Sequence, residues 1–143
     1  MTMLYLARPI DRSRPQSSEI EQDFKSGMTE AGFLGFIFSP ASGVTLSGTL
    51  SQADVQKLVK VNRSCLENSD ALVVIYQPGY ESWGVPQELL FAWSALVPIF
   101  CLLPDGVTYD GMPVYFRAWC QQDHCVYSYS ELVAALELQI GEG

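Results

Sequence analysis

The 143-residue chain is poor in basic residues. It contains eight lysines and arginines against 16 aspartates and glutamates, which gives a formal net charge of −8 at pH 7. Most of such a surface repels a phosphate backbone, and no run of Lys or Arg offers one a footprint. The sequence therefore argues against nucleic acid as a partner.

Long hydrophobic runs are also missing. The longest apolar stretch, around residues 95–103, is far shorter than the roughly 20 residues that a membrane-spanning helix needs, and it contains Pro98. The N-terminus enters an apolar segment at once, without the basic segment that opens an export signal. We expect a soluble, cytoplasmic protein with no membrane partner.

Cysteine and histidine are scarce, since the chain has four cysteines and one histidine. The cysteines lie at irregular spacings in or beside apolar segments and form no CxxC pair, so we expect buried thiols rather than a disulfide framework. Cys120, His124 and Cys125 are close in sequence, but no fourth ligand follows at a zinc-site spacing. We expect neither a metal nor a cofactor.

The apolar content is high, at 48% of residues, which is enough for the core of one domain spanning residues 1–143. Short apolar runs predict strands at residues 3–7, 33–38, 70–75, 97–103 and 125–127. Helical spacing and capping signals predict helices at about 18–31, from 51 to about 66, around Glu88 to about 95, and from 128 onward. Residues 114–119 fit either a helix or a strand.

Strands that alternate with helices imply right-handed crossovers, so we expect an α/β fold of three layers with a mainly parallel, five-stranded sheet. In such folds ligands bind beyond the carboxyl ends of the strands, where the strand order reverses, often between the first and third strands. That rule selects two loops, residues 8–14 and 79–88.

Glu88 is the most informative residue in these loops, because it follows a turn and precedes an apolar helix segment. The helix N-terminus favours an anion there, while apolar neighbours disfavour one. A poorly solvated carboxylate is suited to attack an electron-poor carbon such as the anomeric carbon of a glycoside. Glu88 can equally cap its helix or pair with an arginine.

The two loops also carry candidate binding residues. Three of the eight basic residues fall within residues 8–14, which suggests an anion site, although they can also solvate a loop. Backbone N–H groups and a hydroxyl at the helix entrance can hold a phosphate, although Ser82 can simply be the N-cap. The candidate substrate-binding residues are Ala7, Arg8, Pro9, Ile10, Asp11, Arg12, Arg14, Tyr80, Ser82 and Gly84.

Two further polar residues need an interpretation. Tyr5 offers an aromatic surface near the predicted site, although such a tyrosine more often belongs to a core. Asp70 begins the third strand, about 20 Å from the site end, so we assign it a structural role.

Three segments resemble a known family. Residues 5–10 read YLARPI, residues 68–74 read NSDALVV, and residues 82–88 read SWGVPQE. They are similar to the YLAGPI opening, the ADxVV strand and the SxGVxxE turn and helix of the nucleoside 2-deoxyribosyltransferase-like superfamily. This superfamily includes nucleoside deoxyribosyltransferases and nucleoside 5′-monophosphate N-glycosidases, and the likeness covers most of residues 3–102.

The resemblance implies a flavodoxin-like or Rossmann-like sheet and a glycosyl-enzyme mechanism. Glu88 would attack C1′ of the sugar, Tyr5 would orient the glutamate or the sugar, and Ser82 with Gly84 would hold a 5′-phosphate. The arginine-rich loop would suit the branch of the family that acts on monophosphates. Relatives usually complete their sites across a dimer interface, so a homodimer or higher oligomer is implied.

The chain departs from the family pattern at two positions. Asn62 stands where many relatives place an aspartate, and an amide cannot act as a general acid or base. Arg8 replaces the usual glycine after YLA. The leading prediction is thus an N-glycosidase or deoxyribosyltransferase with Glu88, Tyr5 and Asn62 in its catalytic site. The alternatives are a non-catalytic nucleotide-binding sensor or interaction module, and a TIR-like NAD glycohydrolase.

Overall fold

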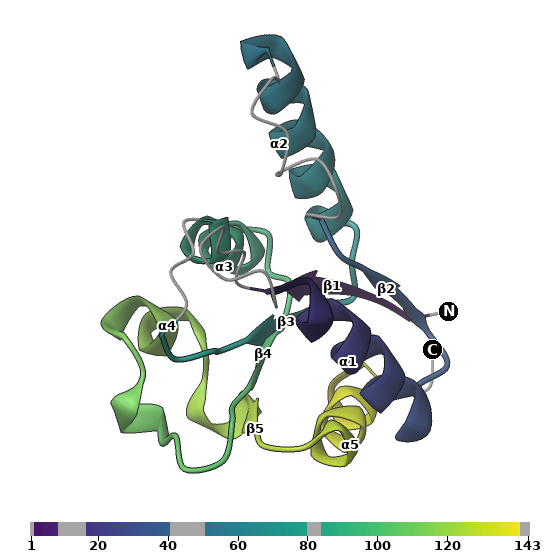
Figure 1. The fold of residues 1–143 in the computed structure, drawn as a ribbon, viewed down its shortest axis with the longest axis vertical. Helices are drawn as coiled ribbons and strands as arrows, with labels where there is room; N and C mark the ends of the chain where they lie inside the picture. Colours follow the sequence, from purple (N-terminus) through teal and green to yellow (C-terminus); the bar gives the residue numbers. More distant parts are fainter. Residues whose placement is uncertain (1, 9–16, 41–50, 80–83, 141–143) are drawn as a thin grey trace.

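Five parallel strands form the centre of the molecule (Figure 1). The structure is a computed structural model, and it describes residues 2–8, 17–40, 51–79 and 84–140. The sheet has the order β2-β1-β3-β4-β5, and its strands are β1 (Met3–Ala7), β2 (Phe36–Phe38), β3 (Ala71–Ile75), β4 (Ile99–Leu102) and β5 (Cys125–Val126). The prediction of a five-stranded, parallel α/β fold is confirmed.

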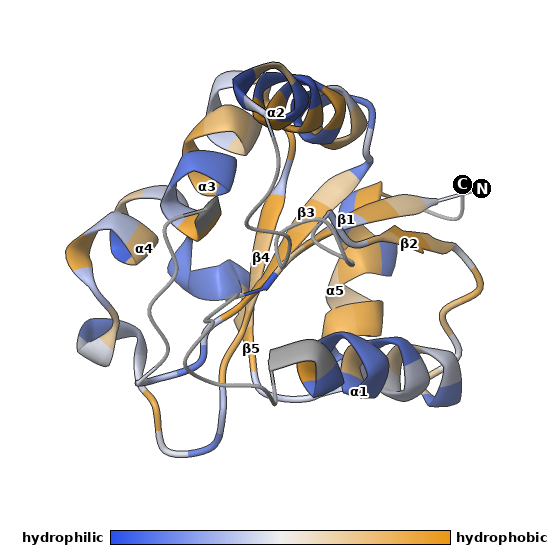
Figure 2. Ribbon diagram, turned by 45° about the horizontal axis from the view of Figure 1, so that its top comes forward, coloured by the Kyte–Doolittle hydropathy of each residue, from blue (hydrophilic) through white to orange (hydrophobic). Residues whose placement is uncertain are grey.

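Helices cover both faces of the sheet. On one face lie α1 (Ser17–Glu30) and α5 (Tyr129–Ile140), and on the other lie α2 (Gln52–Glu67), α3 (Gly84–Ser94) and α4 (Val114–Trp119). Figure 2 shows the apolar strands in the middle of the molecule, with many hydrophilic residues along α1 and α2. Consecutive strand residues point to opposite faces, so Leu4 and Leu6 pack toward α1 and α5, whereas Tyr5 and Ala7 pack toward α2 and α3.

The strand order reverses at β1. The chain passes from β1 through α1 to β2 at one edge, and then through α2 to β3 on the other side of β1. In register, Tyr5 lies opposite Leu72 and Ala7 lies opposite Val74. The carboxyl ends of β1 and β3 therefore flank the predicted switch point.

Strand β3 begins one residue later than predicted, and β2 and β4 begin two or three residues later because the preceding helices end in hydrogen-bonded turns. Phe33 N donates to Met28 O at 2.9 Å, with Gly32 at φ +96°, so residues 33–35 leave α1 and β2 begins at Phe36. Val97 N likewise donates to Ala92 O at 2.9 Å, and β4 begins at Ile99. Residues 114–119, which fitted either structure, form a helix.

Two of the predicted capping signals lie in the described part of the chain, and both are confirmed. Ser51 Oγ accepts from Asp54 N at 3.2 Å, and Ser128 Oγ accepts from Glu131 N at 3.1 Å. The side chain of Ser18 lies outside the described residues. None of the described helices has the length and apolar character needed to cross a bilayer.

Helix α2 projects beyond the edge of the molecule (Figure 1). Its final turn is anchored by the fully buried Leu66, whereas Val55, Val59 and Val61 are each 44–47% exposed. The apolar surface of α2 therefore packs against the rest of this chain mainly at the C-terminal end of the helix.

Candidate active site

Tyr5 and Glu88 form the centre of the candidate site. Tyr5 is buried on the α3 side of β1, and Glu88 is partly buried in the second turn of α3. The Tyr5 hydroxyl donates a hydrogen bond to the Glu88 carboxylate. Packing of α3 over the switch point therefore brings together two predicted catalytic residues that are far apart in the sequence.

Burial raises the pKa of Glu88 from 4.5 to about 7. The hydrogen bond from Tyr5 and the positive charge of Arg8 both favour the carboxylate, but they only partly offset its loss of solvation. The helix dipole adds little, because α3 begins at Gly84 and dipole effects fade beyond the first turn. Glu88 is therefore a carboxyl group that gains or loses its proton near neutral pH.

Tyr5 remains a hydrogen-bond donor throughout the physiological range. Burial, together with the negative charge of Glu88, raises the pKa of its phenol far above the ordinary value. Its ring packs 5.6 Å from that of Phe38 on β2, and the Cys65 thiol of α2 lies near its hydroxyl. Phe38 and Cys65 were not singled out from the sequence, although Phe38 ends the strand beside β1.

Arg8 is buried on the other side of the switch point. Its Nη2 lies 3.3 Å from Glu21 Oε2 on α1, and its Nε donates to Ser39 Oγ at 3.3 Å. Glu21 also pairs with Lys25 Nζ at 3.0 Å. Arg8 thus holds α1 to the ends of β1 and β2 while its charge acts on Glu88. A direct role for Arg8 in binding substrate stays a prediction.

For three of the other predicted site residues, the structure gives only a position in the fold. Ala7 is buried at the end of β1, and Gly84 begins α3. Asn62 is partly buried on α2, and among the described residues no hydrogen bond or ion pair joins it to Glu88 or Tyr5. The remaining predicted residues lie outside the described part of the chain: Pro9, Ile10, Asp11, Arg12, Arg14, Tyr80 and Ser82.

Asp70 and His124 have structural contacts. Asp70 Oδ2 accepts from Met3 N at 2.7 Å, at the end of β1 away from the site, as its predicted structural role requires. His124 Nδ1 lies 3.0 Å from Ile99 O, and its ring stacks 4.5 Å from that of Phe100. Within residues 2–8, 17–40, 51–79 and 84–140 no three His, Cys, Asp or Glu side chains are arranged to hold a metal ion.

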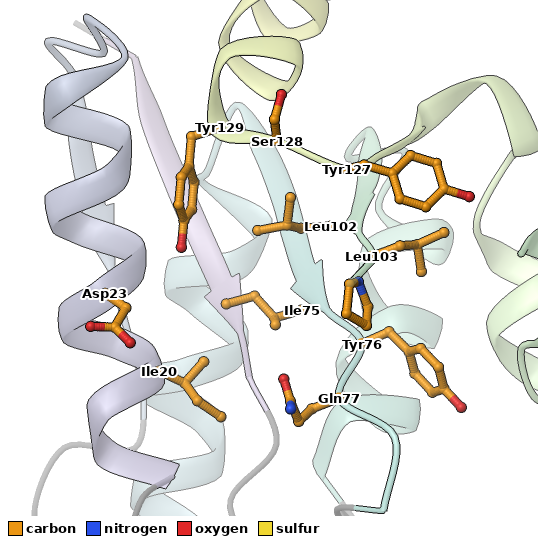
Figure 3. A pocket seen from close by; sticks show the side chains of 11 residues that line it. Ile20, Asp23, Ile75, Tyr76, Gln77, Leu102, Leu103, Tyr127, Ser128 and Tyr129 are labelled. Atoms are coloured by element: carbon orange, nitrogen blue, oxygen red, sulfur yellow. The ribbon is translucent and has the colours of Figure 1, made fainter. Parts of the chain in front are cut away.

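A pocket of about 420 Å³ opens at the carboxyl ends of β3 and β4. In Figure 3 the side chains of Ile20, Ile75 and Leu102 point into the space between α1 and the strand ends. Asp23 and Gln77 supply polar groups at its wall. The pocket was not predicted, because its walls come from four separate segments: residues 20–23, 75–77, 102–104 and 127–129.

Known proteins resemble this one in structure but not in sequence, so the comparison supports the fold alone. The sequence matches no protein-family model and no curated protein. A 2-deoxyribosyltransferase from Bacillus psychrosaccharolyticus is similar in structure, with a TM-score of 0.72 and 14% identity over 92% of this chain and 90% of the Bacillus chain. A conserved protein from Enterococcus faecalis V583 gives a TM-score of 0.74 at 14% identity, over 96% of this chain and 98% of its own.

The fold is that of a 2-deoxyribosyltransferase. A 2-deoxyribosyltransferase from Leishmania mexicana is also similar, with a TM-score of 0.53 and 13% identity over 76% of this chain and 69% of its own. Identities of 13–14% establish the architecture only. The activity has to be argued from the side chains at the switch point.

Proposed function

We propose that this protein cleaves the N-glycosidic bond of a nucleoside or nucleotide, with Glu88 as the nucleophile. One observation carries the proposal: Glu88 is hydrogen-bonded to Tyr5 at the switch point of a fold shared with 2-deoxyribosyltransferases. Glycosyl transfer through a carboxylate needs a poorly solvated anion facing the anomeric carbon. A carboxyl group with a pKa of about 7 beside a neutral donor has that character.

In the proposed reaction the ionised Glu88 attacks C1′. A bond forms between a carboxylate oxygen and C1′, the C1′–N bond breaks, and its electron pair leaves with the base. Water or a second base then attacks C1′ and releases Glu88. The hydrogen bond from Tyr5 fixes the orientation of the carboxylate through both steps.

The departing base needs a proton, and the side chain at position 62 cannot donate one. Asn62 offers only amide hydrogen bonds, so the proton comes from solvent or the base leaves as an anion. Bases that are readily protonated or that leave easily as anions are therefore the preferred substrates.

We extend the proposal to a homodimer that packs through α2. Val55 and Val59 are exposed one turn apart on the same face of a helix that projects from the body, and an identical surface on a second copy would cover them. Light scattering should show a dimer for the native chain and a monomer for Val59→Asp. A native monomer would contradict this extension.

The competing function is a nucleotide sensor in which Glu88 binds a ribose without cleaving the substrate. Asn62 favours this reading, because it removes a general acid from the site. A sensor would bind nucleotides tightly and release no base. Glu88→Gln would then weaken binding rather than abolish a reaction.

The decisive experiment incubates the protein with nucleosides, nucleoside 5′-monophosphates and NAD, and measures free base by chromatography. We expect release from at least one nucleoside or monophosphate, its loss in Glu88→Gln, and its retention in Glu137→Gln, which alters an exposed carboxylate of α5. A second base added as acceptor separates transfer from hydrolysis. Tight binding without release of base would refute the enzymatic proposal.

A further inference from the structure

Three of the four cysteines gather on the α4 side of β4. Cys101 is fully buried in β4, Cys125 opens β5, and Cys120 follows the last residue of α4. The Cys101 thiol donates a hydrogen bond to Met112 Sδ at 3.9 Å, and Cys120 and Cys125 both act on its pKa. This cluster of sulfur atoms takes no part in the proposed glycosidic chemistry.

The sheet register places two of these cysteines directly opposite each other. Cys101 pairs with Cys125 across the parallel strands β4 and β5, and both side chains face the core beneath α4. Neighbouring strands lie about 4.8 Å apart, which falls within the range of about 4.4–6.8 Å between Cα atoms of disulfide-bonded cysteines. A bond between their sulfurs therefore needs side-chain rotation and little movement of the backbone.

The environments of the two cysteines differ in the way that oxidation requires. Cys125 is partly exposed, whereas Cys101 is buried behind it. The Cys125 thiol donates to Gln121 O at 3.4 Å. The neighbouring Cys101 lowers the pKa of the Cys125 thiol, against the opposing effects of burial and of the Asp123 carboxylate. Hydrogen bonding and burial raise the pKa of Cys101. A partly exposed thiol with a lowered pKa, next to a second thiol, is the arrangement found in peroxide-sensitive cysteines.

We propose that Cys125 and Cys101 are a peroxide-oxidised dithiol, with Cys125 as the attacking and Cys101 as the resolving residue. The Cys125 thiolate attacks hydrogen peroxide, so that an S–O bond forms, the O–O bond breaks, and hydroxide leaves to become water with one proton. The Cys101 sulfur then attacks the Cys125 sulfenic acid. An S–S bond forms, the S–O bond breaks, and the second water leaves with the proton of the Cys101 thiol.

The test treats the native protein with hydrogen peroxide and counts free thiols after denaturation. We expect the count to fall from four to two and to return to four with a dithiol reductant. Cleavage with trypsin and with a protease that cuts before aspartate separates all four cysteines, which fall in fragments 64–69, 70–104, 118–122 and 123–143. The expected cross-link joins fragment 70–104 to fragment 123–143.

Single serine variants assign the two roles. Cys101→Ser should accumulate a Cys125 sulfenic acid that a dimedone probe labels, and Cys125→Ser should give neither label nor cross-link. Cys65→Ser is the control, because Cys65 lies on α2 outside the cluster, and it should form the cross-link as the native protein does. A disulfide that includes Cys120 or joins two chains, or thiols that peroxide leaves unchanged, would overturn the proposal.

Discussion

Replacing Glu88 by glutamine is expected to stabilise the folded protein at pH 8 while abolishing its activity. The pKa of Glu88 rises from 4.5 to about 7 on folding, so the folded state binds its proton more tightly than the unfolded state does. Between these two values the folded state holds more protons, and stability falls as the pH rises. Above pH 7 the native protein bears the full cost of a buried, ionised carboxylate.

The magnitude follows from the size of the shift. One pKa unit corresponds to about 1.4 kcal/mol, so burial of the ionised Glu88 costs up to about 3 kcal/mol at pH 8 and below about 1 kcal/mol at pH 5. Glutamine keeps the shape and can still accept the hydrogen bond from Tyr5, but it carries no charge. The stability advantage of Glu88→Gln over the native chain should therefore shrink by about 2–3 kcal/mol between pH 8 and pH 5.

Denaturant unfolding at the two pH values measures this difference directly. Glu137→Gln is the matched control, since it makes the same chemical change on the exposed face of α5. A Glu88→Gln variant that is less stable than the native chain at pH 8, or whose advantage is the same at pH 5 and pH 8, would refute the assignment of Glu88 as a desolvated carboxylate.

Three further substitutions test the surroundings of Glu88 and one helix end. Tyr5→Phe removes a hydrogen bond that lowers the pKa of Glu88, so the rise of base release with pH should move above pH 7; an unchanged pH–rate profile would contradict the pairing. Glu21→Gln removes the ion pair with Arg8 and should lower the free energy of unfolding by about 1–2 kcal/mol. It should also move the rise of base release to lower pH, because the positive charge of Arg8 is then no longer offset by Glu21 and lowers the pKa of Glu88 further. Leu96→Gly should raise stability by about 0.5–1 kcal/mol without changing activity, because Leu96 adopts φ 60° at the end of α3 and is 89% exposed; a loss of stability would show that its left-handed backbone carries no strain.

The sequence predicted the elements whose signals are local. The run Ala71–Ile75 is a strand buried on both faces, and the Ser128 cap starts α5 where its spacing to Glu131 placed it. The starts of β2 and β4 were misplaced because apolar residues such as Phe33 and Val97 serve helix-ending turns as readily as strands. Apolar character alone does not distinguish these two uses.

Glu88 and Tyr5 were predicted individually, but their contact depends on how α3 docks on β1. The pKa of Glu88 depends on where α3 begins, because a helix dipole acts mainly within the first turn. A start at Gly84 leaves Glu88 past the first turn, so burial outweighs the dipole. The ion pair between Arg8 and Glu21 was not predicted, because nothing local in the sequence indicates that α1 lies across the end of β1.

The charge balance at Glu88 bears on the choice between nucleoside and monophosphate substrates. One unit charge at about 8 Å from the Glu88 carboxylate changes its free energy of ionisation by about 2 kcal/mol at an effective dielectric constant of about 20. This corresponds to roughly 1.5 units in the pKa of Glu88. A phosphate group near −2 would therefore raise the pKa of Glu88 by about three more units and leave it protonated at neutral pH. Arg8 is already engaged by Glu21, so the compensating charges would have to come from Arg12 and Arg14. An uncharged nucleoside needs no such compensation, and the arginines of residues 8–14 rather than Glu88 would decide which substrate reacts.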